Sequence, residues 1–469
     1  MADLSIQSTQ GENLWDKLDR PKFIVGPMVD QSELPFRLLC RKYGAHLCYT
    51  PMLHAAIFVK DPKYRKENLV PCDQDRPLIV QFCANDPETF LQAARLATPF
   101  CDAIDLNLGC PQTIAKRGHY GAFLEDEWTL LHAMVRKVSS ELSIPVTCKI
   151  RIFPDVKKSI RYAQMLVSAG CQLLTVHGRT KEQKGVLTGL ADWEQIKEIK
   201  NSISIPVFAN GNIQSLEDVF NCLRTTGVEG VMSAEGVLHN PAVFQGVHPH
   251  IWIVAEEYLT FVKQYPCALS IIRGHLFKFY HITLTLEENF DLRRLLAKAN
   301  TMKHFFDFAE LMKMRCIIRD DLEPWPITTY PIPTYLCQPH FRSLAVKISI
   351  ESTNPTPSKR RLQGQELDPV LSSRATKRLN VAKNKLEGIV KIAGRRLPLC
   401  SSCPNPKGGR CDFDLCRACC RNRAFERVLD CLGHKFLFKS KQNKNAIELN
   451  PQCQVAKDSL LSILTNVQE

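Results

Sequence analysis

Eight cysteine and histidine residues crowd into one short stretch near the C-terminal end of this 469-residue chain. Residues 400–434 follow the pattern Cys-x2-Cys-x7-Cys-x4-Cys-x2-Cys-Cys-x10-Cys-x2-His. Thiolates and imidazoles are ligands that Zn²⁺ prefers, and each structural zinc takes four of them in a tetrahedron. The pattern therefore predicts two zinc ions, with the ligands Cys400, Cys403, Cys411, Cys416, Cys419, Cys420, Cys431 and His434.

The segment is too short to build a hydrophobic core, so we expect it to fold only with metal. Coincidental free thiols are disfavoured, because several ligand pairs are separated by two residues. An iron–sulfur cluster is less natural among interleaved arginines and a histidine. The arginines suit RNA binding, although a protein-docking module fits nearly as well; they are Arg410, Arg417, Arg421, Arg423 and Arg427.

A second set of polar and turn residues follows short apolar runs in the first half of the chain. Packing alone does not require such residues after so many runs, so we interpret them as one site. The set comprises Gly26, Pro27, Met28, Gln81, Asn107, Lys149, His177, Asn210, Gly211, Asn212, Ala234, Glu235 and Gly236.

Lys149 ends the apolar run in PVTCKIR, so its ammonium group faces either solvent or a buried anion. A reduced flavin carries negative charge near N1, which a fixed lysine would stabilise. His177 ends LLTVHGRT and could contact a phosphate or a substrate. Residues 210–212 and 234–236 follow the last two runs, where barrels commonly bind phosphate, although 210–212 alone would be an ordinary turn.

Cys110 lies in DLNLGCPQ, directly after an apolar run and between Gly109 and Pro111. These neighbours open the backbone and stop the strand, so we expect the thiol to project from a loop. An ordinary cysteine thiol, with a pKa of about 8.5, is mostly protonated at neutral pH and can act as a general acid. Taken alone, Cys110 would more often be a packed structural cysteine.

The elements that must position these residues are eight apolar runs separated by helical patterns. Continuous apolar strands between amphipathic helices indicate a parallel sheet, and eight of them favour a closed (β/α)8 TIM-type barrel. The connection between Tyr49 and Leu78 is weak as a helix. The runs are Phe23–Val25, Leu47–Tyr49, Leu78–Val80, Ala103–Leu106, Pro145–Cys148, Leu173–Val176, Pro206–Ala209 and Gly230–Met232.

Six segments together resemble the signature motifs of the tRNA-dihydrouridine synthases, in order and in spacing. They are FIVGPMVDQSELPFR, IDLNLGCPQ, VTCKIR, LTVHGRT, FANGNI and MSAEGVLHNP, and the resemblance covers about residues 20–340. The chain is most similar to the eukaryotic tRNA-dihydrouridine synthase 1-like subgroup.

The resemblance implies FMN as the cofactor, NADPH as its reductant, and uridines 16 and 17 of the tRNA D loop as substrate. It implies that Cys110 protonates uracil C5 while hydride reaches C6. Bacterial members often carry Gly-Arg where this chain has Ala234-Glu235, so we expect only the backbone of Glu235 to contribute. The implied flavin contacts are Pro27, Met28, Val29, Gln81, Lys149, His177, Asn210, Gly211, Asn212, Ala234 and Glu235.

The positive charge of the chain, +13 overall, is concentrated at its C-terminal end. Residues 355–469 hold 22 Lys/Arg and 10 Asp/Glu, whereas residues 1–354 carry a net charge of only +1. Such a basic region favours a nucleic-acid contact, with a solvated linker as the plain alternative. We expect a monomer. We also expect no membrane span, because the nearest candidate segment, Ile251–Val262, is short and charged.

The N-terminus lacks the basic start and apolar run of a signal peptide, so we expect a cytoplasmic or nuclear protein, or both. Lys359, Arg360 and Arg361 could be a nuclear signal or a phosphate contact. We expect an α/β barrel, a helical domain and a small zinc module. The expected divisions are 1–20 (extension), 21–250 (FMN-binding barrel), 251–345 (helical tRNA-contacting domain), 346–397 (basic flexible linker), 398–436 (zinc module) and 437–469 (tail).

Two other functions stay open at this point. The first is a flavin oxidoreductase acting on a free pyrimidine or another small molecule, which the basic, metal-binding tail argues against. The second is a non-catalytic RNA-binding adaptor, which the presence of Cys110, Lys149 and His177 argues against.

Overall fold

A computed structural model describes residues 13–322, 332–340, 389–392, 395–407, 411–427, 429–434 and 436–437. The chain divides into two compact units, residues 1–349 and residues 350–469. Lys359, Arg360, Arg361, most of the expected linker and nearly all of the expected tail lie outside the described residues. None of the helices in the described part combines the length and the apolar character that a membrane span requires.

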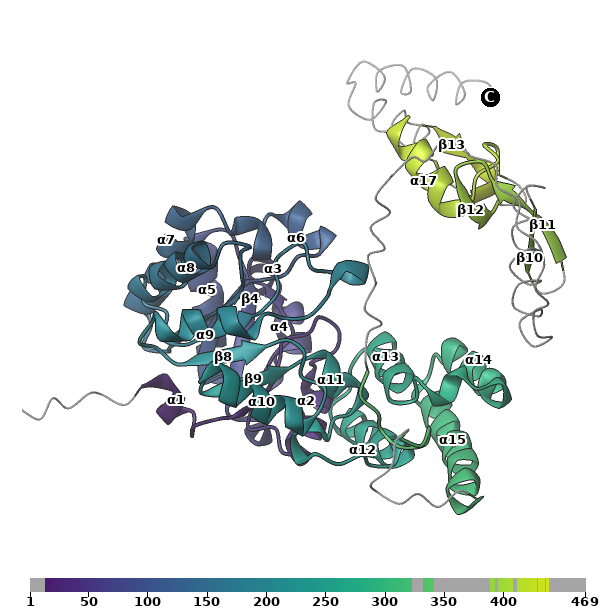
Figure 1. Ribbon diagram of the computed structural model, residues 1–469, viewed down its shortest axis with the longest axis horizontal. Helices are drawn as coiled ribbons and strands as arrows, with labels where there is room; N and C mark the ends of the chain where they lie inside the picture. The colour runs from purple at the N-terminus through teal and green to yellow at the C-terminus, as the bar shows by residue number, and fades with distance from the viewer. Residues whose placement is uncertain are drawn as a thin grey trace, which may run out of the picture. The chain divides into compact units, whose positions relative to one another are not determined.

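The first unit is built on eight parallel strands that close into a barrel (Figure 1). Seven neighbouring pairs run in the order β2-β1-β9-β8-β7-β6-β5-β4, and an additional β2–β4 pairing closes the ring. The strands are β1 (Phe23–Val25), β2 (Leu47–Tyr49), β4 (Leu78–Cys83), β5 (Ala103–Leu108), β6 (Val146–Arg151), β7 (Leu174–His177), β8 (Val207–Asn210) and β9 (Gly230–Ser233).

Each of the eight apolar runs forms a strand, so the predicted (β/α)8 barrel is confirmed. The connection after β2 differs from the loop-like segment that we expected. It holds a two-residue strand, β3 (Leu53–His54), which pairs with β4, and two short helices, α3 (Ala55–Lys60) and α4 (Pro62–Asn68). Asp61 accepts a hydrogen bond from the amide of Lys63 and caps α4, which explains how so polar a segment begins a helix.

Helices cover the outside of the barrel (Figure 1). Their buried faces pack on the outward side chains of the strands in one large apolar core. Ser215 and Asp218 form a capping box at the start of α10, and Gly227, with a φ of 68°, ends that helix. The main helices are α2 (Leu34–Lys42), α5 (Pro87–Ala97), α7 (Trp128–Glu141), α8 (Val156–Ser168), α9 (Trp193–Asn201), α10 (Leu216–Thr226) and α11 (Glu235–His239).

A separate, smaller core fills the inside of the barrel. It contains inward residues such as Ile24, Tyr49 and Phe208, together with Leu14 and Leu18 from the start of the chain. Helix α1 (Leu14–Lys17) therefore contributes to the barrel interior, although we expected residues 1–20 to be an extension. Polar side chains occupy later positions of the same strands, so the chemistry lies at the carboxyl ends of the strands.

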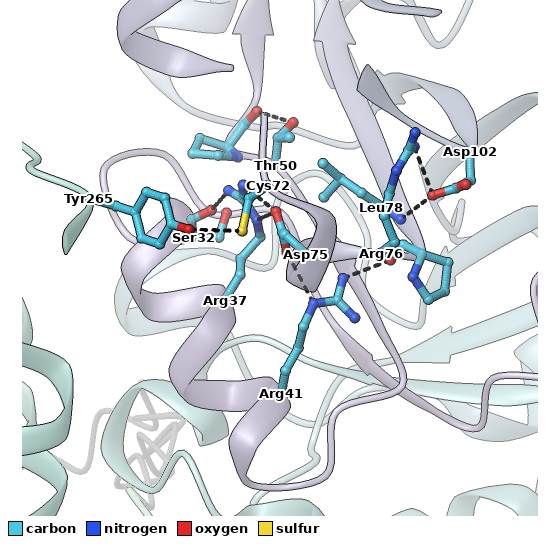
Figure 2. Close-up of polar contacts among 12 residues, drawn as sticks. Ser32, Arg37, Arg41, Thr50, Cys72, Asp75, Arg76, Leu78, Asp102 and Tyr265 are labelled. Carbon is cyan, nitrogen blue, oxygen red and sulfur yellow. Dashed lines mark hydrogen bonds and ion pairs between the residues drawn. The ribbon is translucent and has the colours of Figure 1, made fainter. Parts of the chain in front are cut away.

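A buried ionic network fixes the segment between α4 and β4 (Figure 2). Arg37 of α2 donates to Asp75 from Nε and Nη2, at 2.9 and 2.7 Å, and Arg41 donates from Nε at 3.0 Å. The side chains of Arg37 and Asp75 are each 2 % exposed. The sulfur of Cys72 lies 3.4 Å from the hydroxyl of Tyr265, so the segment also contacts the helical region that follows the barrel.

Helices α12 (Ile251–Gln264), α13 (Leu269–Phe279), α14 (Phe290–Lys298) and α15 (Met302–Leu322) follow the barrel and belong to the same compact unit. Helix α12 packs on α2. Glu33, at the start of α2, accepts hydrogen bonds from Tyr258 of α12, at 2.7 Å, and pairs with His275 of α13 at 3.0 Å. These contacts bind the helical region firmly to the barrel.

The second unit contains a small, strand-rich module around residues 389–437. Strands β10 (Ile389–Ile392), β11 (Arg395–Cys400) and β12 (Cys403–Pro406) form an antiparallel sheet. Helix α17 (Arg417–Glu426) and a short pair, β13 (Asp430–Cys431) with β14 (Phe436–Leu437), complete the described part. The sheet begins at Ile389, within the stretch where we expected the basic linker.

Candidate active site

The register of the barrel places the polar residues of β4 to β8 side by side at one end. Gln81 pairs with Asp105, Asn107 with Lys149, and His177 with Asn210. Carboxyl ends of parallel strands meet at one rim, and alternate residues of each strand face inward. Residues far apart in the chain therefore form one polar layer above the apolar barrel interior.

Lys149 is the cation at the centre of this layer. Its Nζ donates to Oδ1 of Asn210 at 3.0 Å, and Nδ2 of Asn210 donates to the carbonyl of Met232 at 2.9 Å. Burial, with help from the nearby Arg151, lowers the pKa of Lys149 from 10.5 to about 8. An ammonium group that burial disfavours gains from any anion placed against it, so this position suits an anionic ligand.

A chain of buried side chains connects the barrel interior to the Cys110 loop. Asp105 accepts hydrogen bonds from Thr147 Oγ1, at 2.6 Å, and from Gln81 Nε2, at 2.8 Å. Asn107 Nδ2 donates to Gln81 Oε1 at 2.7 Å, and Asn107 Oδ1 accepts from the amide of Cys110 at 2.9 Å. Burial raises the pKa of Asp105 to about 6, and the hydrogen bonds from Thr147 and Gln81 limit that rise.

Cys110 lies in a half-buried loop whose backbone is fixed from both sides. Its carbonyl accepts from the amide of Ala122 at 3.1 Å, and Arg151 Nε donates to the carbonyl of Gly109 at 2.8 Å. A Cβ atom at Gly121 would lie 2.9 Å from the Cys110 carbonyl oxygen, so the close approach requires glycine. The thiol packs in a small cluster with Cys83 and Tyr120.

His177 and Asn212 are joined through Arg179. Burial, reinforced by the charge of Lys149, holds the pKa of His177 well below its usual value. The imidazole is therefore neutral, and its Nε2 accepts from Arg179 Nη1 at 3.0 Å. Arg179 Nη2 also donates to Asn212 Oδ1, and Gly211 between them has a φ of 117° that only glycine adopts easily.

The remaining predicted residues lie at the rim, after strands β1 and β9. Pro27 and Met28 follow β1 and are half-buried, whereas the side chain of Val29 is 54 % exposed. Ala234 precedes α11, and Glu235 is its first residue. Gly236 is packed against the carbonyl of Ile213 so closely that a Cβ atom would lie 2.3 Å from that oxygen.

Four residues of the network were not predicted from the sequence: Asp105, Thr147, Arg151 and Arg179. Each lies two residues from a predicted site residue on the same strand or on its extension. The alternation of a strand places such positions on the same face, so spacing alone could have indicated them. What the sequence could not show is their partners, because Arg151 donates to carbonyls of residues 109 and 180.

The C-terminal module separates the predicted metal ligands into two groups. One group comprises Cys411, Cys420, Cys431 and His434, and the other comprises Cys400, Cys416 and Cys419. In each group the ligand atoms lie within 4.8 Å of one another. The side chain of Cys403 is outside the described residues, but its backbone pairs directly with that of Cys400. The two sets therefore alternate along the chain, as two interleaved four-ligand sites would require.

The chain is also similar in sequence to known proteins. A family profile described as "Dihydrouridine synthase (Dus)" matches residues 24–313. A Mus musculus protein named "tRNA-dihydrouridine(16/17) synthase [NAD(P)(+)]-like" is 52% identical over 444 residues, which cover 93% of this chain and 92% of the relative. A Saccharomyces cerevisiae protein named "tRNA-dihydrouridine(16/17) synthase [NAD(P)(+)]" is 43% identical over 371 residues, which cover 72% of this chain and 87% of the relative.

Proposed function

Because this chain belongs to the dihydrouridine synthase family, we propose that it reduces uridines 16 and 17 in the D loop of tRNA to 5,6-dihydrouridine. The enzyme is an oxidoreductase, because its relatives are named dihydrouridine synthases with NAD(P)(+) and the formation of dihydrouridine from uridine is a reduction. The position of the modified uridines is supported by relatives from mouse and yeast whose names carry the designation 16/17. The observation that carries the proposal is a fixed Cys110 loop beside a polar layer centred on Lys149.

The polar layer fits FMN. Lys149, which burial leaves poorly solvated, suits the ring edge where reduced flavin is anionic. Val29 is an exposed apolar side chain at the rim, and a bound aromatic ring would cover it. Gln81, Asn210 and the pair His177–Arg179 supply hydrogen-bonding groups around the same rim. When bound, FMN supplies the hydride for uracil C6, and NADPH supplies it in turn to the flavin.

The residues of this chain then have separate tasks. Lys149 and Asn210 would hold the cofactor, while neutral His177 and Arg179 lie toward the loops after β7 and β8. The Cys110 thiol donates the proton to uracil C5 as a general acid. Asn107 and Arg151 fix the backbone of its loop on two sides, so that the thiol is held in place before the base arrives.

The substrate base must leave its stack to reach a barrel mouth. Unstacking costs a few kcal/mol, and less in a tRNA loop whose bases are already splayed. We propose that the basic C-terminal module, with two zinc ions, contributes affinity for the tRNA backbone. Arg417, Arg423 and Arg427 are exposed on it. The protein acts as a monomer in the cytoplasm, the nucleus or both.

The proposal is tested by mapping dihydrouridine in an unmodified tRNA transcript after incubation with the purified full chain, FMN and NADPH. We expect dihydrouridine at positions 16 and 17 and none when NADPH is omitted. Free uridine under the same conditions is the matched control and should not react. Reduction of free uridine with an unchanged tRNA would favour the small-molecule oxidoreductase instead. A protein without bound flavin and without product would favour the RNA-binding adaptor.

A further inference from the structure

Three histidines lie together in the first unit, and no step of the proposed reaction uses them. His239 ends α11, His281 follows α13, and His340 lies in the described segment 332–340. Each offers a ring nitrogen, and the three nitrogens lie within 4.8 Å of one another. They are separated by 42 and 59 positions in the sequence, so the fold alone brings them together.

The spacing of two of these nitrogens matches that of ligands on one metal ion. Nδ1 of His239 lies 3.2 Å from Nδ1 of His281. Two imidazole nitrogens on a tetrahedral zinc, each at about 2.0–2.1 Å from the ion, are separated by about 3.4 Å. The ring of His281 stands nearly perpendicular to the other two, at 71° and 82°, and nitrogens of all three rings lie within 4.8 Å of one another.

The third ring, that of His340, packs against the other two. His340 stacks on His239 with 4.4 Å between ring centroids and an angle of 18° between planes. Nδ1 of His281 also lies 3.0 Å from the carbonyl oxygen of Lys278, and a metal at Nδ1 would replace the proton of that contact. The positive charge of Lys278 acts on His239 in the cluster. The negative charge of the Glu235 carboxylate acts in turn on Lys278.

We propose that His239, His281 and His340 bind one divalent transition-metal ion, zinc in the cell. Three neutral imidazoles with a fourth position for water are a donor set that zinc accepts, and nitrogen ligands favour it over Mg²⁺ or Ca²⁺. The same donor set also suits copper and nickel, and the supply of metal in the cell decides between them.

The ion would join three parts of the first unit. Helix α11 directly follows barrel strand β9, and His281 belongs to the helical region. The segment that carries His340 is attached to both: the amide of His340 donates to Oε1 of Gln214 at 3.3 Å, and the amide of Cys337 donates to the carbonyl of Pro249 at 2.8 Å. A metal at this junction would fasten the helical region to the barrel next to the cofactor rim.

The test is a zinc count on the full chain, purified without added metal or a histidine tag and dialysed against metal-free buffer. His281→Gln and His340→Gln replace one ligand each with a side chain of similar size. His132→Gln, on α7 and outside the cluster, is the matched control. The cysteine sites of the C-terminal module are intact in all four proteins, so their zinc cancels in the comparison.

Both cluster variants should carry about one zinc fewer per chain than the wild type and His132→Gln, with unchanged bound FMN. If His281→Gln fails to fold, His340→Gln decides, because its side chain is half-buried in a segment without helix. Equal zinc in the cluster variants and the wild type would overturn the proposal.

Cobalt substitution separates this site from the cysteine sites. The spectrum of cobalt-loaded wild type minus that of His340→Gln should contain d–d bands in the visible range without a thiolate charge-transfer band. A difference dominated by thiolate charge transfer would show that the lost metal came from the C-terminal module, and it would equally overturn the proposal.

Discussion

At the scale of residues, strand ends indicated where the site lies but not how its members hold one another. Lys149, His177 and Asn210 were predicted from their place after apolar runs, and the barrel register brings the strand ends that carry them together. Their partners were not predictable, because a hydrogen bond such as Arg179 to Asn212 joins loops 33 positions apart. Asp105 was not predicted, because the sequence alone does not show which side chains donate hydrogen bonds to a carboxylate inside an apolar strand.

Replacing Lys149 with methionine should weaken FMN binding but stabilise the flavin-free protein. The variant should retain FMN poorly, because the cation at the anionic ring edge is gone. Without flavin, the folded protein binds the Lys149 proton less tightly than the unfolded chain, since its pKa falls from 10.5 to about 8. Burial of the charged Lys149 therefore lowers the free energy of unfolding of the flavin-free wild type by up to about 3 kcal/mol below pH 8. The variant should unfold at a higher temperature in this pH range.

This stability difference should shrink as pH rises from 8 to 10.5, because the wild type then folds without burying a charge. Thermal unfolding of flavin-free protein at pH 7 and pH 10, with flavin content by absorbance, measures both effects. Lys137→Met on the outer face of α7 is the control and should leave flavin content unchanged. A Lys149→Met protein that retains FMN as well as the wild type would contradict the assigned role.

At the scale of elements, the apolar runs predicted all eight barrel strands, whereas the connections were harder. Residues 53–68 form β3, α3 and α4. A polar cap on α4 and the pairing of β3 with β4 stabilise this segment, and no apolar periodicity in the sequence predicts it. Helix α1 packs Leu14 and Leu18 into the barrel interior, and two apolar residues in a polar segment gave no such signal. Local capping and tertiary burial thus decided the elements that periodicity did not reveal.

The ionic network of α2 predicts a large loss of stability from a single substitution. Asp75→Asn keeps the shape of the side chain but leaves the buried Arg37 without its counter-charge, and Arg41 loses its carboxylate too. Breaking a buried ion pair in this way costs about 3–5 kcal/mol. Asp126→Asn removes an exposed partner of Lys158 and should cost no more than about 1 kcal/mol.

Urea unfolding of the two variants beside the wild type gives the comparison directly. Equal midpoints for Asp75→Asn and Asp126→Asn would show that the network contributes nothing beyond a surface pair. The expected order is wild type and Asp126→Asn close together, with Asp75→Asn well below both.

At the scale of the whole molecule, a nearly neutral catalytic unit is followed by a basic, cysteine-rich one. The boundary between the two compact units falls at residues 349 and 350, and the finer division of the chain, with a helical domain that ends at residue 345, stays a prediction. Spacing also predicted a cluster of metal ligands, but not which ligands share an ion. The alternation of the two groups along the chain depends on the fold of β11, β12 and α17.

Removing residues 355–469 should leave a folded, flavin-containing barrel that binds tRNA more weakly. The removed part carries a net charge of +12, so the affinity difference from the full chain should shrink as salt concentration rises. The full chain should lose about two zinc ions by this truncation. Filter binding across a salt series measures the first effect, and unchanged affinity would make the module a protein-docking or targeting element.

Two half-reactions measured on one variant test whether Cys110 delivers the proton to the substrate. Cys110→Ala keeps the Cβ atom that packs beside Gly121 and the backbone bonds to Asn107 and Ala122, so fold and flavin content should persist. Cys83→Ala removes a neighbouring thiol of the same cluster and is the matched control.

Flavin reduction by NADPH should be unchanged in Cys110→Ala, whereas reoxidation of the reduced enzyme by tRNA should slow by about 10²–10⁴-fold, as loss of a general acid typically does. Cys83→Ala should stay close to the wild type in both steps. Loss of both steps in Cys110→Ala would mark a structural cysteine, and reoxidation by tRNA at the wild-type rate would show that another group donates the proton.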